Sequence, residues 1–280
     1  MEDSQVHGVP LCNPDELPAA GPNLFVEITS RCNLACSFCP HTHLSRPKAD
    51  MAKRTYDILV NRIEEHLRTR EGGFEVTFSL YGEPLMHPEF VDFIRALDPT
   101  GARVFVETNG MFLNESAARS LMETECVKAV IIGVDAVTAD TYARVRPGGD
   151  FKLVRENIDR LLLLRSDQND RELIVGLSFL RLRENDGELL DFYQYWQKRA
   201  DHVLVLGYND FSGNLPDRKA ADFTPLRRSP CRRIRSSLTV LQDGGYVICP
   251  QDFDGKTSSI TVADTSFDEA FQQEGVRTIL

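Results

Sequence analysis

Several features of membrane, secreted and nucleic-acid-binding proteins are missing from this sequence. No apolar run is long enough to span a bilayer, and residues 1–21 lack the basic and then apolar pattern of a signal peptide. Basic residues are also in deficit, since 32 Lys and Arg stand against 42 Asp and Glu, a formal net charge of -10. Sequence-independent binding of nucleic acid needs Lys and Arg to neutralise phosphate, so this balance disfavours it. We therefore expect a cytoplasmic protein with neither a membrane nor a nucleic-acid partner, and the acidity would suit a cationic substrate as well as solubility.

The seven cysteines are an odd number, and their spacing is not that of a secreted disulfide framework. Cys32, Cys36 and Cys39 form a C-x3-C-x2-C motif shortly after an apolar run. Three closely spaced thiolates can hold three irons of a cubic [4Fe-4S] cluster, which leaves the fourth iron open to an outside molecule. The same cysteines with His41 or His43 could instead form a closed Cys3His zinc site, as in a zinc-binding interaction module.

Strand-like runs alternate with helix-like runs through residues 23–208. The expected strands cover 24–29, 75–80, 103–107, 128–134, 173–179 and 203–207, and the expected helices cover 55–68, 88–97, 115–124, 152–164 and 186–199. Strands rich in β-branched residues and separated by helices predict a parallel sheet, and six of them predict an α/β fold of the partial (β/α)6 barrel type. An irregular, proline-containing arm is expected over 1–22 and a bridging segment over 209–230.

Residues able to do chemistry follow the first four expected strands. The cysteine motif follows the first, Tyr81-Gly82-Glu83-Pro84 the second and Thr108-Asn109-Gly110 the third, and Asp135 follows the fourth. Ligands of parallel α/β folds bind at the carboxyl ends of the strands, so we expect all four groups on one rim. A zinc-binding module needs no such arrangement, and the pattern therefore favours the iron-sulfur interpretation.

This combination resembles the radical S-adenosylmethionine (SAM) family. Phe38 precedes the third cysteine, and Tyr81-Gly82-Glu83 is similar to the family's Gly-Gly-Glu segment with Tyr in place of the first Gly. Gly133 replaces the serine of the Ser-Leu-Asp segment to which Asp135 belongs. The resemblance implies that the open iron chelates SAM and that one electron, from an external reductant of the flavodoxin or ferredoxin type, cleaves SAM to a 5'-deoxyadenosyl radical. The implied SAM-binding residues are Phe38, Tyr81, Gly82, Glu83, Thr108, Asn109, Asp135 and Arg146.

Residues 231–280 have a different pattern. An alternating residue pattern of the strand type over 237–241 and 246–249, with Asp243-Gly244-Gly245 as a turn between the two runs, predicts a β-hairpin. The C-x12-G-x4-C spacing that ends at Cys249 resembles the SPASM and twitch appendages of radical SAM enzymes, which bind an auxiliary [4Fe-4S] cluster. Cys231 is then an implied ligand of a possible auxiliary cluster. The later C-x2-C pair of those appendages is missing, so the sequence is truncated, the cluster is incomplete, or a hairpin cysteine is free.

A free Cys249 would suit an epimerase, which needs a thiol to return a hydrogen atom on the face opposite the abstraction. The nearest resemblance is to the radical SAM enzymes that tailor aminoglycosides, and it implies inversion of one sugar carbon, of the type that converts neomycin C to neomycin B. The expected contacts to a cationic aminosugar are Tyr208, Asn209, Asp210, Asp252 and Asp254, although turn chemistry also accounts for the acids. Alternatives are an aminocyclitol or aminoglycoside dehydrogenase, with an auxiliary cluster as electron acceptor, and a radical SAM enzyme that modifies a ribosomal peptide.

Overall fold

The computed structural model describes residues 23–69, 73–167, 173–222, 233 and 236–271. The expected arm over 1–22 and Cys231 therefore lie outside the described residues, as do residues 223–230 of the expected bridging segment. Within the described ranges, no helix has the length and apolar character needed to cross a bilayer.

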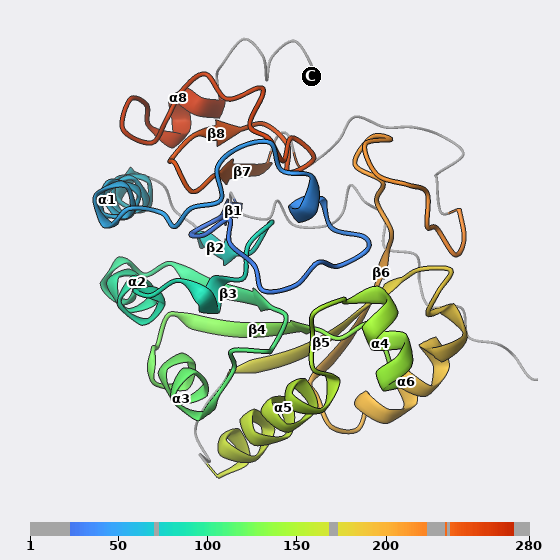
Figure 1. The fold of residues 1–280 in the computed structure, drawn as a ribbon. Coiled ribbons are helices and arrows are strands. Elements are labelled where there is room, and N and C mark those ends of the chain that lie inside the picture. Colours follow the sequence, from blue (N-terminus) through green and yellow to red (C-terminus); the bar gives the residue numbers. More distant parts are fainter. Residues whose placement is uncertain (1–22, 70–72, 168–172, 223–232, 234–235, 272–280) are drawn as a thin grey trace, which may run out of the picture.

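The fold is built on one open eight-stranded sheet with the order β6-β5-β4-β3-β2-β1-β7-β8 (Figure 1). Its first six strands are β1 (Asn23–Val26), β2 (Glu75–Phe78), β3 (Arg103–Thr108), β4 (Val127–Gly133), β5 (Ile174–Arg181) and β6 (His202–Gly207). Neighbours among them pair in parallel, which confirms the predicted partial barrel. Their carboxyl ends consequently share one rim.

Helices cover the outside of the curved sheet, and the loop after β1 lies on its inner side (Figure 1). The helices of this layer are α1 (Lys53–Thr69), α2 (Phe90–Leu97), α3 (Glu115–Glu123), α4 (Ala139–Val145), α5 (Phe151–Ser166) and α6 (Leu189–Trp196). Short 3-10 turns occupy η1 (Pro40–His43), η2 (Pro84–Met86), η3 (Asp98–Thr100) and η4 (Asp186–Glu188). The sequence did not predict α4, a short helix that begins where Thr138 accepts a hydrogen bond from the Thr141 N–H at 3.3 Å.

The predicted hairpin is confirmed as β7 (Ser237–Val240) and β8 (Tyr246–Val247), which pair antiparallel. Strand β7 also pairs in parallel with β1, so the hairpin continues the main sheet and covers the edge of β1. Helix α8 (Phe267–Phe271) follows, and the Phe267 ring stacks on Phe74 with ring centroids 5.6 Å apart. Helix α8 is thereby packed onto the barrel beside the amino end of β2, opposite the rim from which the cysteine loop leaves β1.

Candidate active site

The loop after β1 carries Cys32, Cys36 and Cys39 as free, half-buried thiols. Two backbone hydrogen bonds fix this loop to the segment after α4: Ala35 N donates to the Pro147 oxygen at 2.9 Å, and Ser37 N donates to the Val145 oxygen at 3.0 Å. The loop is therefore held on both sides of Cys36.

Burial raises the pKa of all three thiols, for Cys32 to about 11 and for Cys39 to about 12. The charges of the three sulfurs also act on one another, because the loop brings them together. Sulfurs in this environment are protonated until a metal supplies the positive charge that replaces the protons. The donor set fits an iron-sulfur cluster, which thiolates hold.

The geometry gives the Cys3His zinc alternative no support. The His41 ring lies with Nε2 3.2 Å from the Lys48 ammonium, and the His43 side chain is exposed. Among the residues that the structure describes, no three Cys, His, Asp or Glu side chains converge on one single-ion site. A cluster has separate irons for its three thiolates, so it does not need the sulfurs to converge on one ion.

Glu83, after β2, is almost fully buried, and both of its carboxylate oxygens accept hydrogen bonds. Its Oε1 accepts hydrogen bonds from the Thr108 hydroxyl at 2.6 Å and the Leu85 N–H at 3.2 Å, while Oε2 accepts from the Asn109 N–H at 2.7 Å. Burial raises the pKa of Glu83, and these hydrogen bonds oppose the rise. The acid thus joins the ends of β2 and β3.

A glycine and a side-chain hydrogen bond bring this rim close to the cysteine loop. A Cβ on Gly82 would lie 1.8 Å from the Thr29 oxygen, so only glycine fits there. The Asn109 amide donates to Asn33 Oδ1 at 2.9 Å and lies 3.9 Å from the Cys32 sulfur. The segments after β2 and β3 therefore rest directly against the loop.

Asp135 and Arg146 form a buried ion pair at the end of β4. Asp135 Oδ2 lies 2.8 Å from Arg146 Nε and 2.7 Å from Nη2, and Oδ1 accepts from the Leu180 N–H at 2.6 Å. Both carboxylate oxygens are thus engaged within the protein. The guanidinium also lies over the Phe38 ring, 5.3 Å from its centroid, and Nη1 is 3.9 Å from the Cys36 sulfur.

The Tyr81 ring lies on the same rim, in contact with an aromatic group that closes its outer side. Its centroid is 6.2 Å from those of Phe211 and Phe253, and its buried hydroxyl has no hydrogen-bond partner among the described residues. Burial raises the pKa of Tyr81, and the nearby charges of Glu27, Cys39 and Cys249 raise it further. An unpartnered buried hydroxyl leaves a hydrogen-bonding position for a bound molecule.

Cys249 lies two residues after β8, half-buried and free. The Gln251 N–H is 3.4 Å from its sulfur, and the Asp252 N–H donates to its carbonyl at 3.0 Å. We call residues 249–255 the mouth segment. Its Phe253 ring packs on Tyr81, so the segment lies beside the rim that carries the cysteine loop.

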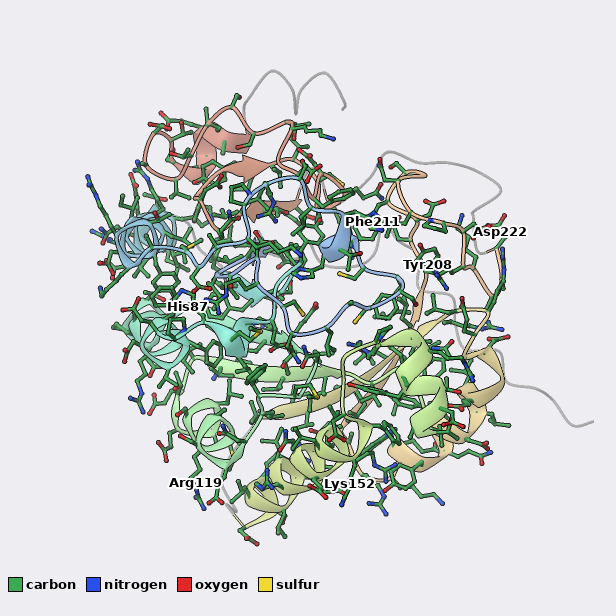
Figure 2. The ribbon with its side chains drawn as sticks, viewed as in Figure 1. His87, Arg119, Lys152, Tyr208, Phe211 and Asp222 are labelled. Atoms are coloured by element: carbon green, nitrogen blue, oxygen red, sulfur yellow. The ribbon has the colours of Figure 1, made fainter. Side chains whose placement is uncertain are left out.

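The expected substrate residues have internal partners. Tyr208 packs with Phe38 in a small apolar cluster and donates its hydroxyl to the Pro216 oxygen at 2.8 Å. Figure 2 shows Tyr208 and Phe211 on the segment after β6. Asn209 accepts from the Phe211 N–H at 2.9 Å, and Asp210 lies 3.5 Å from the Lys219 ammonium.

The two acids of the mouth segment are engaged in different ways, Asp252 in a local turn and Asp254 in a long-range contact. Asp252 accepts from the N–H groups of Lys256 at 2.9 Å and Thr257 at 2.7 Å, and Asp254 accepts from the Ser45 N–H at 2.8 Å. The hydrogen bonds of Asp252 correspond to the turn chemistry that the sequence left open, whereas Asp254 joins the mouth segment to the segment after η1.

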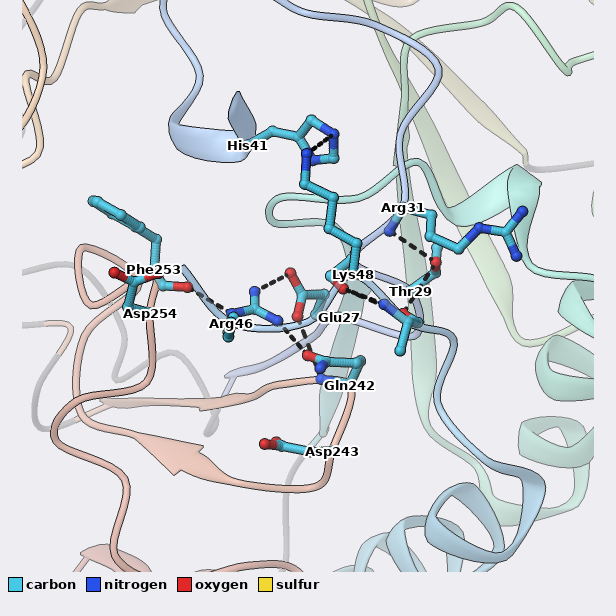
Figure 3. Close-up of polar contacts among 12 residues, drawn as sticks. Glu27, Thr29, Arg31, His41, Arg46, Lys48, Gln242, Asp243, Phe253 and Asp254 are labelled. Atoms are coloured by element: carbon cyan, nitrogen blue, oxygen red, sulfur yellow. Dashed lines mark hydrogen bonds and ion pairs between the residues drawn. The ribbon is translucent and has the colours of Figure 1, made fainter. Parts of the chain in front are cut away.

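A buried polar network between the cysteine loop and the hairpin was missed by the sequence analysis (Figure 3). Arg46 Nη2 lies 2.6 Å from Glu27 Oε1, Nη1 donates to the Gln242 side chain, and Nε donates to the Phe253 oxygen at 2.7 Å. Glu27 is fully buried, and burial raises its pKa to about 7 although Arg46 opposes the rise. The available signal was a charged residue at the end of an apolar strand run, since such a residue needs a buried partner.

Residues 26–195 match the sequence pattern of the radical SAM superfamily, which is more than half of the chain. The chain belongs to the radical SAM superfamily. Membership brings the cofactors of the family, a [4Fe-4S] cluster and SAM.

Relatives and solved structures agree with the family. A protein of Treponema pallidum without an assigned function is 29% identical over 189 residues, which cover 63% of this chain and 52% of the relative. The tungsten-containing aldehyde ferredoxin oxidoreductase cofactor-modifying protein of Pyrococcus furiosus is 28% identical and covers 61% of this chain and 47% of its own length. This chain therefore spans about half the length of these two relatives.

The fold is similar to that of BtrN in complex with AdoMet and 2-DOIA, with a TM-score of 0.64, 18% identity, and coverage of 92% of this chain and 85% of BtrN. It is also similar to anSMEcpe with bound AdoMet, with a TM-score of 0.71, 15% identity, and coverage of 93% and 80%. Both likenesses extend beyond the barrel to the hairpin.

Proposed function

We propose that this radical SAM protein is an epimerase that inverts one sugar carbon of a cationic aminoglycoside, in the manner of a conversion of neomycin C to neomycin B. The observation that carries the proposal is Cys249, a free and half-buried thiol on the mouth segment, beside the rim that bears the cysteine loop. An epimerase needs such a thiol, because hydrogen must return from the face opposite its removal.

In this proposal Cys32, Cys36 and Cys39 hold the cluster, and the rim residues bind SAM. The bound cluster and SAM supply a 5'-deoxyadenosyl radical when an external flavodoxin- or ferredoxin-type reductant provides one electron. Gly82 lets the backbone of the rim approach the cysteine loop closely, and the buried Tyr81 hydroxyl is available as a donor. Glu83 is the acid proposed to accept from the SAM ammonium, while its hydrogen bonds to Thr108 and Asn109 orient it.

The hydrogen balance assigns Cys249 a defined step. A sugar C–H bond breaks as its hydrogen atom leaves to the deoxyadenosyl group, and the carbon radical then takes a hydrogen atom from the Cys249 thiol on its other face. A new C–H bond forms with inverted configuration, and a thiyl radical remains on the sulfur. One electron and one proton from the external reductant and solvent restore the thiol. The substrate therefore undergoes no net oxidation.

The substrate contacts proposed are Asn209, which is exposed, and Asp210, which is half-buried, both after β6. Asp210 can exchange its 3.5 Å pairing with Lys219 for an ammonium group of the sugar. Asp252 and Asp254 act indirectly by fixing the mouth segment, because Asp252 holds a local turn and Asp254 binds the Ser45 N–H. Tyr208 supplies an apolar ring next to Phe38. The net charge of -10 favours a polycation.

A dehydrogenase is the second candidate, supported by the likeness to BtrN, whose complex contains 2-DOIA. In that reaction Cys249 and Cys231 would bind an auxiliary cluster that accepts an electron from the substrate. Modification of a peptide is the third, since relatives and neighbours include the mycofactocin maturase MftC and SuiB bound to a precursor peptide.

The test is anaerobic turnover of the reconstituted protein with SAM, reductant and neomycin C in deuterated water, analysed by mass spectrometry and NMR. We expect one deuterium at an inverted carbon, whereas Cys249→Ala should form deoxyadenosine without the epimer. Cys126→Ala is the matched control, because that thiol is buried against Ile94 and should leave the product unchanged. A product two hydrogens lighter would favour the dehydrogenase, and epimer formation by Cys249→Ala would refute the role of the thiol.

A further inference from the structure

Arg146 is a buried cation that the proposed reaction does not use. It follows α4, and its side chain is only 10% exposed. A buried guanidinium is costly unless its charge is compensated. The groups that surround the guanidinium therefore indicate the role of its positive charge.

One side of the guanidinium is fixed rigidly. Nε and Nη2 both bind Asp135 Oδ2, at 2.8 and 2.7 Å, and the other oxygen of Asp135 is held by the Leu180 N–H. Asp135 itself has a φ of 61°, in the left-handed region that non-glycine residues seldom adopt. From this backbone geometry the carboxylate is directed at Arg146.

Gly133 provides the space for this arrangement. A Cβ at this position would lie 2.3 Å from Arg146 Nη2, so the guanidinium occupies the volume that a side chain would fill. The position of Arg146 therefore depends on the absence of a side chain at Gly133.

The opposite side of the guanidinium faces the cysteine loop. Nη1 lies 3.9 Å from the Cys36 sulfur, and the Phe38 ring lies against the guanidinium at 5.3 Å. The backbone hydrogen bonds from Ala35 to Pro147 and from Ser37 to Val145 connect the residues that flank Cys36 with those that flank Arg146. The distance between the cation and the sulfur is thus set by the backbone on both sides.

We propose that Arg146 is a positioning residue that holds a fixed positive charge and an N–H donor against the Cys36 sulfur and thereby raises the reduction potential of the cluster. The physical reason is that reduction adds one negative charge, which a nearby cation and a hydrogen bond to a ligand sulfur stabilise. The proposal rests on Cys36 as a cluster ligand and is independent of the substrate and of Cys249.

The experiment is a potentiometric titration followed by electron paramagnetic resonance, without SAM or substrate, together with iron and sulfide analysis. We expect Arg146→Gln to keep its iron but to shift the reduction equilibrium at least tenfold toward the oxidised form, about 59 mV for one electron. Arg146→Lys should restore part of the shift. Gly133→Ala should act in the same direction, because it displaces the guanidinium without removing it. Arg144→Gln is the matched control, since that arginine on α4 bonds to Thr141 and should leave the potential unchanged.

Two results would overturn the proposal. The first is a wild-type reduction potential in Arg146→Gln at full iron content. If that variant also binds SAM more weakly, Arg146 is a SAM-binding residue. If Arg146→Gln loses its iron, its potential cannot be measured, and Arg146→Lys and Gly133→Ala become the test. Wild-type potentials in both of these variants would also overturn the proposal.

Discussion

The cofactor rim and the mouth segment differ in how their side chains are held. On the rim, partners come from different strands: Glu83 after β2 binds Thr108 and Asn109 after β3, and Asp135 after β4 binds Arg146 after α4. In the mouth segment Asp252 binds residues four and five positions further along the chain. The rim is therefore ordered by contacts between strands, whereas Asp252 of the mouth segment is held by a local turn.

This difference in how side chains are held can be related to function. Chemistry common to a superfamily needs a geometry fixed by many long-range contacts, because a small displacement of a catalytic group is costly. A surface that distinguishes substrates benefits from local turns that can change without disturbing the core. The mouth segment also has long-range contacts, with Arg46, Ser45 and Tyr81 and with Phe211 and Ser212 after β6, and these set its position beside the rim.

The largest expected effect comes from breaking the rim at its sulfur ligands. Cys36→Ala should lower the iron content and reduce SAM cleavage to the level of a protein-free control, because three thiolates are the minimum ligand set of the motif. Iron and sulfide analysis after anaerobic reconstitution measures this directly. Cys126→Ala, a buried thiol outside the loop, should retain its iron. Full iron content in Cys36→Ala would place the cluster elsewhere.

The next effect concerns the connection between the two regions. Arg46→Met leaves the fully buried Glu27 without its cation, which should cost about 3–5 kcal/mol of unfolding free energy at pH 8. Denaturant unfolding is the measurement. Arg31→Met, which breaks the exposed pair with Asp50, is the control and should cost less than about 1 kcal/mol.

The same network predicts a pH dependence. Burial raises the pKa of Glu27 from 4.5 to about 7, so between these values the folded protein binds more protons than the unfolded chain. The contribution of Glu27 to stability is then fully present below about pH 4.5 and lost as the pH rises through about 7. Without Arg46 the pKa of Glu27 rises further, so the pH range in which the folded protein binds the extra proton extends upward. The loss of unfolding free energy caused by Arg46→Met should therefore be smaller at pH 6 than at pH 8. Glu27→Gln should flatten the dependence, and an unchanged slope in that variant would show that Glu27 does not titrate there.

A smaller effect is expected at the closest backbone approach of the rim. Gly82→Ala places a methyl group 1.8 Å from the position of the Thr29 oxygen, an overpacking that should cost about 1–3 kcal/mol. Because the strain lies beside the cysteine loop, reconstitution with iron should also be slower. Gly187→Ala is the matched control, since a Cβ there meets no atom within 4 Å. Equal stability of the two variants would mean that the backbone of the rim can shift to accommodate the methyl group at little cost.

Sequence reasoning reached the strands and the rim because both depend on local pattern. Continuous apolar runs located the six barrel strands, although β1 ends at Val26 and not at Thr29. The rule that ligands bind at strand ends then grouped Glu83, Asn109 and Asp135 correctly on one rim. Helix α4 was missed because its seven residues carry little apolar periodicity.

The network of Glu27, Arg46 and Gln242 could not be derived in the same way. Arg46 lies 19 residues from Glu27, and Gln242 lies 215 residues from it, so no local pattern connects them. The pairing arises only because β7 lies beside β1, a tertiary contact that the separate assignment of residues 231–280 did not include. The roles of Cys249 and of the individual SAM contacts stay predictions.

The smallest expected effect tests whether the mouth segment is locally held. Asp252→Ala removes the acceptor for the N–H groups of Lys256 and Thr257, which should cost about 1 kcal/mol and speed their hydrogen exchange several-fold. Exchange in β1 to β4 should not change, because these hydrogen bonds do not reach the sheet. Asp264→Ala is the control, since it opens a similar exposed turn at Thr261 and should leave the mouth segment unaffected. Faster exchange throughout the barrel in Asp252→Ala would show that the mouth segment is part of the cooperative core, and the contrast between the two regions would then be wrong.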